Sequence, residues 1–444
     1  MRRKTAAAAG ALLALAASLF TGPSTARAAD PAAGFHVRDG RLLDASGEDF
    51  VLRGVNHAHA WYPGRTGRAL ADLKALGANS ARVVLGTGDR WARNGPADVA
   101  AVVAQCRAHR LVCVLEAHDT TGYGEQAGAV SLARAVDYWI DVQDAVKGQE
   151  KYVILNIGNE PHGNSGYAAW TADTSNAINR MRAAGFTHTL MVDAPNWGQD
   201  WSFTMRDNAP GVFASDPRRN TVFSVHMYGV FDTATEVQDY LNRFSSRGLP
   251  LVVGEFGDAH SDGDPDENAI MATAGRLGLG YLGWSWSGNG GGVEYLDLAT
   301  DFDAGRLTPW GNRLFHGADG IKATAREAGV FGTPGGPATG SCAVDYRLQD
   351  WGGSFNADVT IRNTSAADIR GWQLDFAFPG GQTLTHAWNA KVVQQGARLR
   401  ATHEPWTGTV PAGGSVSFGM TGSSTGPNGT PASFVLNGTP CGRS

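Results

Sequence analysis

Eight short apolar runs recur through the first three hundred residues, and longer amphipathic stretches separate them. The runs span 51–56, 81–86, 111–118, 152–160, 189–195, 222–228, 251–256 and 281–286. Stretches between them place apolar residues at three- and four-residue intervals, as in 67–76, 97–109 and 168–184. This spacing is typical of helices with one buried face. Strands that alternate with such helices form a parallel sheet, and eight units predict a (β/α)8 TIM barrel.

An open, doubly wound sheet shares this alternation and is the main alternative. It normally carries a glycine-rich phosphate loop after an early strand, and the sequence has none in register. Polar and aromatic residues instead follow several of the runs, which is the pattern of a barrel whose strand ends carry the chemistry. A hairpin of 35–37 with 41–43, turned at Asp39-Gly40, precedes the first run.

The chain of 444 residues is long enough for two domains and a removable leader. Arg2, Arg3 and Lys4 precede an Ala/Leu run and the small-residue site 26–28, so residues 1–29 are predicted to be a secretory signal peptide. A buried core helix is the alternative, and a membrane span is disfavoured because the run is short. We therefore expect a secreted, extracellular protein.

Three further divisions are predicted from composition. Residues 30–331 form the barrel domain, 332–341 a linker rich in Gly, Pro and Thr, and 342–444 an antiparallel β-sandwich. The last segment shows alternating strand patterns, as in 358–362 and 415–418.

Four cysteines in a secreted chain favour disulfides. We predict Cys106 with Cys113 and Cys342 with Cys441, because the second pair brackets the C-terminal segment. Three connectivities remain open from sequence alone. For the local pair, the alternative is that Cys106 and Cys113 are two buried thiols.

Glu160 and Glu255 each end a buried run, about three strand-helix units apart. Parallel strands of a barrel bring such residues to one pocket, and glycoside hydrolysis needs a carboxylic acid opposite a carboxylate. We predict Glu160 as the general acid/base and Glu255 as the nucleophile of a retaining reaction. The alternative is that both are ordinary strand-end carboxylates in ion pairs.

Further residues at the predicted strand ends are candidates for contact with a sugar. Arg82 and Tyr228 are expected to keep Glu255 ionised, and Asn159 to donate to a sugar hydroxyl. Indole faces stack on sugar rings. The candidate substrate-binding residues are Asn56, His57, Trp61, Arg82, His118, Asn159, Trp197, His226, Tyr228 and Trp284.

No cofactor is expected, and a metal remains undecided. His57 and His59 share a strand face, but no third zinc ligand follows at suitable spacing. The acidic loop 258–267 offers oxygen ligands for a structural calcium ion, with a solvated loop as the alternative. A formal charge of −5 disfavours nucleic acid as a partner.

The C-terminal segment carries Trp351, Trp388 and Trp406 in Gly-, Asn- and Thr-rich surroundings, whereas Trp372 sits in an alternating run and is expected in the core. Three exposed tryptophans on one sheet face would form a flat apolar strip suited to a flat polysaccharide. Packing of all three in the core is the alternative.

Residues 34–331 resemble the bacterial β-mannanases of glycoside hydrolase family 5, through segments 53–61, 81–84, 115–124, 157–161, 224–228, 254–257 and 284–289. The resemblance implies a retaining endo-acting hydrolase with Glu160 and Glu255 in the roles above. Residues 342–441 resemble a family 2 carbohydrate-binding module, although Thr407 follows Trp406 where the family often has asparagine. The resemblance implies binding of cellulose, chitin or, in one branch, xylan, and the three tryptophans favour cellulose.

The sequence therefore predicts a secreted, monomeric endo-β-1,4-mannanase that cleaves mannan, glucomannan and galactomannan and is held on cellulose by its C-terminal module. An endo-β-1,4-glucanase on the same scaffold is one alternative, because only the configuration at C2 separates the two sugars. A non-catalytic polysaccharide-binding protein is the other.

Overall fold

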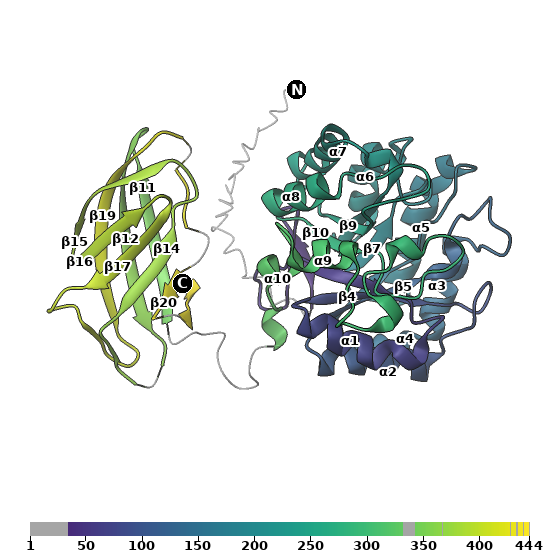
Figure 1. The fold of residues 1–444 in the computed structure, drawn as a ribbon, viewed down its shortest axis with the longest axis horizontal. Helices are drawn as coiled ribbons and strands as arrows, with labels where there is room; N and C mark the ends of the chain where they lie inside the picture. The colour runs from purple at the N-terminus through teal and green to yellow at the C-terminus, as the bar shows by residue number, and fades with distance from the viewer. Residues whose placement is uncertain are drawn as a thin grey trace, which may run out of the picture.

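The computed structural model describes residues 34–331 and 342–443, except 366, 427, 432, 433 and 438. The predicted signal peptide (1–29) and linker (332–341) lie outside the described residues. Figure 1 shows the two folded units, an α/β barrel and a β-sandwich. Among the described residues, no helix combines the length and apolar character that crossing a membrane requires.

Eight parallel strands close into a barrel in sequence order, and β10 pairs with β3 to complete the ring. Every residue in these strands is buried, because side chains point either into the barrel or against the helices. The predicted TIM barrel is confirmed. The strands are β3 (Arg53–His57), β4 (Ser80–Leu85), β5 (Val112–Ala117), β6 (Val153–Asn156), β7 (Leu190–Asp193), β8 (Thr221–Met227), β9 (Leu251–Phe256) and β10 (Gly280–Gly283).

Helices surround the strands (Figure 1). Several begin at a side chain that accepts a backbone N–H, such as Ser131 before α3 and Asp266 before α8. The α-helices are α1 (Thr66–Ala75), α2 (Pro96–Ala108), α3 (Leu132–Asp141), α4 (Gln143–Val146), α5 (Trp170–Ala183), α6 (Thr204–Ser215), α7 (Ala234–Ser246), α8 (Glu267–Leu277), α9 (Pro309–His316) and α10 (Ile321–Thr324). Short 3-10 helices are η1 (Pro63–Arg65), η2 (His118–Thr120), η3 (Tyr167–Ala169), η4 (Gly229–Phe231), η5 (Glu294–Leu296), η6 (Thr300–Phe302) and η7 (Gly329–Phe331).

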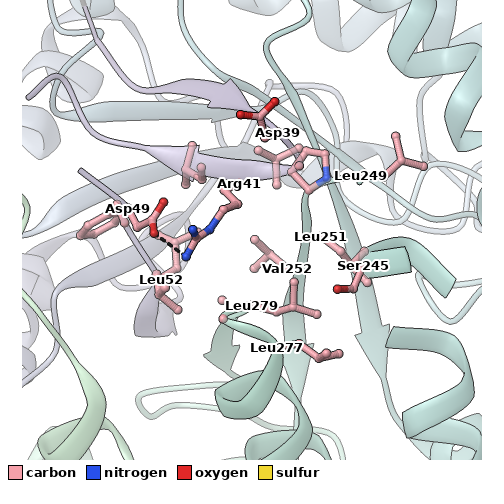
Figure 2. Close-up of a pocket in the computed structure, with 18 of the residues that line it drawn as sticks. Asp39, Arg41, Asp49, Leu52, Ser245, Leu249, Leu251, Val252, Leu277 and Leu279 are labelled. Carbon is pink, nitrogen blue, oxygen red and sulfur yellow. Dashed lines mark ion pairs between the residues drawn. The ribbon is translucent and has the colours of Figure 1, made fainter. Parts of the chain in front are cut away.

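The predicted hairpin is present as β1 (His36–Arg38) and β2 (Arg41–Leu43), with Asp39 and Gly40 in the turn at positive φ. Beside it, a cavity of about 290 Å³ reaches the N-terminal ends of β8, β9 and β10. Figure 2 shows its leucine-rich wall and the ion pair of Arg41 with Asp49. Barrel enzymes carry their catalytic residues at the C-terminal ends of the strands. This cavity is at the N-terminal ends, so it lies at the opposite end of the barrel from the candidate site.

The C-terminal unit is a sandwich of two five-stranded sheets and a two-stranded ribbon. Its pairings are antiparallel, except that β22 pairs with β11 in parallel. Trp372 is buried and stacks on Phe418, so its predicted place in the core is confirmed. The strands are β11 (Cys342–Asp350), β12 (Ser354–Asn363), β13 (Ile369–Arg370), β14 (Gln373–Ala377), β15 (Gln382–Trp388), β16 (Ala390–Gln395), β17 (Arg398–His403), β18 (Thr409–Val410), β19 (Ser415–Ser424), β20 (Phe434–Leu436), β21 (Thr439–Pro440) and β22 (Gly442–Arg443).

One of the two predicted disulfides is present. Cys342 is bonded to Cys441, with Cα atoms 4.9 Å apart, and this bond joins the two ends of the sandwich. The predicted Cys106–Cys113 bond is wrong, because both residues are free thiols. Cys106 on α2 meets Cys113 on β5 inside the layer between helices and strands, where both pack as small apolar side chains. Burial raises the pKa of the Cys113 thiol well above its ordinary value.

Candidate active site

Two carboxylates meet at the C-terminal end of the barrel. Glu255 lies in β9, and Glu160 follows β6. Nδ1 of His226, in β8, lies 2.8 Å from Oε1 of Glu160 and 3.5 Å from Oε2 of Glu255. This nitrogen and one oxygen from each carboxylate all lie within 4.8 Å of one another. Retaining glycosidases place their carboxyl groups about 5–5.5 Å apart, and inverting ones about 6.5–9.5 Å. The geometry therefore fits covalent catalysis with retention.

Glu160 owes its position to an unusual backbone conformation. Strand β6 ends at Asn156, and the chain then turns so that Glu160 has φ 41°, a left-handed value that a strand cannot contain. The backbone N–H of Glu160 donates to Asp193 over 3.3 Å, and its carbonyl accepts from Gly122. Sequence patterns extended this strand to Glu160, and the structure shows that Glu160 lies in the loop that follows.

Glu255 accepts hydrogen bonds from two side chains. Nη1 of Arg82 lies 2.7 Å from Oε1, and the hydroxyl of Tyr228 donates to Oε2 over 3.1 Å. Burial raises the pKa of Glu255, while the positive charges of His226 and Arg82 oppose that rise and Glu160 adds to it. The two donors to its oxygens favour the ionised carboxylate.

Arg82 is the centre of the buried network. Burial lowers its pKa, but Glu116, Asp193 and Glu255 more than offset this, so the net pKa is raised and the guanidinium stays charged. Its other hydrogen bonds go to side-chain oxygens of Asn56, Asn156, Asn159 and Asp193.

His226 is a fully buried cation. Burial lowers its pKa, but the charges of Glu255 and Asp193 raise it to about 10. Nε2 lies 3.3 Å from Oδ2 of Asp193. Burial raises the pKa of Asp193, but the charges of His226 and Arg82 lower it, and the net pKa falls to about 2.

Four predicted substrate-binding residues lie beneath the carboxylates. Asn56, Arg82, Asn159 and His226 are buried, and their side chains bond to one another or to the carboxylates. The amide of Asn159 donates to Thr121. These residues shape and charge the site from below.

The prediction for His57 is wrong. Its ring is buried and hydrogen-bonds through Nε2 to Thr66 on α1, over 2.9 Å. Because Asn56 points into the barrel, the next residue of the strand must point toward the helices. His59 also contacts Thr66, which confirms the prediction that His57 and His59 point to the same side. That side faces α1 and not the carboxylates.

Three of the other predicted residues form an aromatic wall. Rings of Trp61 and His118 have centroids 5.2 Å apart, and His118 stacks with Trp284 at 5.9 Å. Trp91, which the sequence did not single out, completes this aromatic wall, 5.4 Å from Trp61. The predicted Trp197 lines a pocket together with Glu160 and Tyr228.

Sequence reasoning missed three buried carboxylates. Oε1 of Glu116 lies 2.8 Å from Nδ1 of His118. Burial lowers the pKa of His118, but the charge of Glu116 raises it, and the net pKa is raised. Asp193 connects Arg82 with His226. Asp119 accepts four backbone N–H groups from residues 87–91 and so holds the loop that carries Trp91. The available signal was an acidic residue within or directly after an apolar run.

The acidic loop has partners in the protein. Asp262 accepts from Gln199 and from the backbone of Gly229, and it contacts His260. Asp266 caps α8. The other acidic side chains of the loop are Asp258, Asp264 and Glu267. Burial raises the pKa of Asp258. Calcium binding by this loop stays a prediction.

The three tryptophans of the sandwich that are predicted to bind polysaccharide are exposed: Trp351 by 59%, Trp388 by 37% and Trp406 by 73%. Trp388 lies over Gly419, its cross-strand partner in β19, where a Cβ would come within 2.0 Å of the indole. The absence of a side chain at Gly419 therefore lets the ring lie on the strand.

Comparisons with known proteins agree with both units. The model of the family Cellulase (glycosyl hydrolase family 5) matches residues 43–290, and the model Cellulose binding domain matches 342–441. A mannan endo-1,4-beta-mannosidase of Streptomyces lividans is 59% identical over 80% of this chain and 92% of its own length. One of Cellvibrio japonicus is 51% identical over 78% of this chain and 79% of its own. The mannohexaose complex of a Thermomonospora fusca beta-mannanase has 59% identity and a TM-score of 0.66, covering 67% of this chain and 99% of that one.

Proposed function

This chain belongs to glycosyl hydrolase family 5, and from that premise we propose that it is an endo-β-1,4-mannanase acting on mannan, glucomannan and galactomannan with retention of configuration. The observation that carries the proposal is the close approach of Glu160 and Glu255 around His226. The relatives that are named mannan endo-1,4-beta-mannosidases support the choice of sugar.

We propose that Glu255 is the nucleophile. Its carboxylate attacks the anomeric carbon and forms a glycosyl-enzyme ester while the glycosidic bond breaks. Arg82 and Tyr228 hold the attacking oxygens in place. In this mechanism the positive charge of buried His226 lies beside both carboxylates, so it stabilises the negative charge that passes between them.

Glu160 is the proposed general acid/base. His226 Nδ1 donates to Oε1 of Glu160, which leaves Oε2 to carry the proton to the departing oxygen. In the second step the ionised Glu160 accepts a proton from water, and the water oxygen attacks the anomeric carbon. We propose that no cofactor is needed, because these carboxylates supply both proton transfer and covalent capture.

The aromatic wall is the proposed contact for sugars on the side of the nucleophile. His118, whose charge acts on Glu255, meets Trp61 edge-on and stacks with Trp284. Asn56, Arg82, Asn159 and His226 act as positioning residues beneath them.

We further propose the division into residues 30–331, a linker at 332–341 and a module at 342–444, in a secreted monomer. The module binds cellulose through Trp351, Trp388 and Trp406, as its match to the cellulose-binding model suggests. A second binding site raises the substrate concentration near the cleft.

The test is a panel of soluble polysaccharides followed by product analysis. Galactomannan and glucomannan should be cleaved internally, with a rapid fall in viscosity, and carboxymethylcellulose should be cleaved poorly. Proton NMR of the first products should detect the β-anomer. Preferential cleavage of carboxymethylcellulose would favour the glucanase, first-formed α-anomer would exclude retention, and binding without cleavage would identify a non-catalytic protein.

A further inference from the structure

Two tryptophans of the aromatic wall come from different loops. Trp61 lies in the turn 58–62 after β3, where its backbone N–H donates to the carbonyl of Ala58. Trp91 lies in the loop between β4 and α2. Their rings meet edge-on, with centroids 5.4 Å apart, and Trp61 is 38% exposed. The spacing of the two rings therefore depends on what fixes one loop against the other.

A chain of hydrogen bonds connects the two loops. His59, in the turn 58–62, is buried, and its Nε2 lies 3.2 Å from Oδ2 of Asp98 on α2. The same carboxylate oxygen accepts from Nδ2 of Asn94 over 2.6 Å. Asn94 in turn donates its backbone N–H to the carbonyl of Gly86 and accepts from the N–H of Gly86. Asn94 thus closes the base of the second loop, and Asp98 joins that base to the turn.

The other nitrogen of His59 extends the chain to helix α1. Nδ1 lies 2.6 Å from the hydroxyl oxygen of Thr66, and Nε2 of His57 lies 2.9 Å from the same oxygen. His57, His59 and Thr66 are all buried. A hydroxyl donates one hydrogen bond and can accept others, so Thr66 can pair with both imidazoles at once.

The ring of His59 is therefore held at both nitrogens. Burial raises the pKa of Asp98, but hydrogen bonds from Asn94 and His59 lower it, and the net pKa is lowered. Asp98 is thus an ionised acceptor, and Nε2 of His59 carries the proton that it accepts. Loss of either partner would leave a buried imidazole nitrogen unpaired, which favours movement of the ring and of the turn that carries it.

We propose, resting on the function proposed above, that His59, Asp98 and Thr66 are positioning residues that hold Trp61 against Trp91 and thereby set the affinity for sugars on the side of the nucleophile. Aromatic faces that are fixed before binding lose little conformational freedom when a sugar binds, and this preorganisation raises affinity. The three residues bond to α1 and α2 and not to the carboxylates, so their effect on the sugar passes through the wall.

The experiment measures kcat and KM of the full chain on mannohexaose. Asp98→Ala should raise KM about fivefold, part of the value of one stacking contact, because the turn is released. The kcat should stay within about twofold, since the wall holds the sugar equally before and during the reaction. The turn keeps its backbone bond from Ala60 to Val84, so it should shift without unfolding.

Two further variants test the chemistry of the chain. Asp98→Asn keeps an oxygen that accepts from His59 and should retain most of the wild-type affinity. Thr66→Val removes the hydroxyl at nearly constant volume, so it should raise KM by about the same factor as Asp98→Ala. The double variant should be no worse than either single one, because both release the same ring.

A double-mutant cycle separates positioning from a general structural role. In a Trp61→Ala background, Asp98→Ala should leave KM unchanged, because the ring that Asp98 positions is gone. His188→Gln is the matched control. His188 is also buried and bonds through Nε2 to the carbonyl of Val146 over 3.0 Å, but it lies before β7, at the N-terminal end of the barrel. This variant should lower the melting temperature and leave KM unchanged.

An unchanged KM in Asp98→Ala, or the same rise in KM with and without Trp61, would overturn the inference. No cleavage of mannohexaose by the wild type would instead overturn the proposed function.

Discussion

The carboxylate site of the barrel and the exposed tryptophans of the sandwich differ in burial and in charge. In the barrel, Arg82 and His226 are fully buried cations that contact buried carboxylates. In the sandwich, Trp351 and Trp406 are more than half exposed. Charges act strongly only where water is excluded, whereas a flat apolar face must be reachable by a polymer. The first arrangement suits bond cleavage, and the second suits adhesion.

The largest effect is expected from removing either carboxylate. Glu160→Ala and Glu255→Ala should each lower kcat on galactomannan at least about 1,000-fold, because proton donation and covalent capture each require one of them. Azide should restore activity on an activated aryl mannoside in both variants, giving the β-azide with Glu160→Ala and the α-azide with Glu255→Ala. The opposite pairing of products would exchange the two roles.

A smaller effect is expected from the buried network. Asp193→Asn should lower kcat about 100-fold, because it removes the charge that pairs with Arg82 and His226. Steady-state kinetics and circular dichroism separate this loss from unfolding. An Asp193→Asn variant that is as active as the wild type would show that the charge of Asp193 is not needed for catalysis.

The same network predicts a pH dependence of stability. The pKa of His226 is raised to about 10 in the folded protein. Its contribution to the free energy of unfolding is therefore complete below about pH 6.5, its unfolded value, and is lost as the pH rises through 10. Melting temperatures from pH 6 to 10.5 should fall for the wild type and fall less for Asp193→Asn. Parallel curves would contradict this assignment.

The exposed tryptophans of the sandwich should give an effect on binding alone. Trp406→Ala is expected to weaken adsorption to cellulose about tenfold, through the loss of one stacking ring, with an unchanged melting temperature because the ring is exposed. Adsorption isotherms measure it, and Val393→Thr, at another exposed apolar residue of the sandwich, is the matched control. Equal weakening in both variants would mean that the tryptophans have no special role.

The smallest effect is expected from removing the whole module. The chain ending at residue 331 should hydrolyse soluble galactomannan like the full chain and lose about fivefold on insoluble wall material. The barrel and the sandwich have separate hydrophobic cores, so each should fold without the other. Equal loss on both kinds of substrate would contradict the independence of the two units.

Much of the site could be predicted because strand ends of a barrel converge. Glu160 and Glu255 follow apolar runs, and closure brings them together. His57 was misplaced although alternation with Asn56 should have turned it toward α1. The predicted Cys106–Cys113 bond is wrong, because closeness along the chain does not set the direction of two thiols.

The sequence by itself determined the number of strand-helix units and the residue types at their ends. Only the tertiary structure decided which charges meet. Asp193 and Glu116 look alike in sequence, yet one lies beside His226 and the other beside His118. The reason is physical: a charge state depends on distance and burial, and residues remote along the chain acquire both only when the barrel closes.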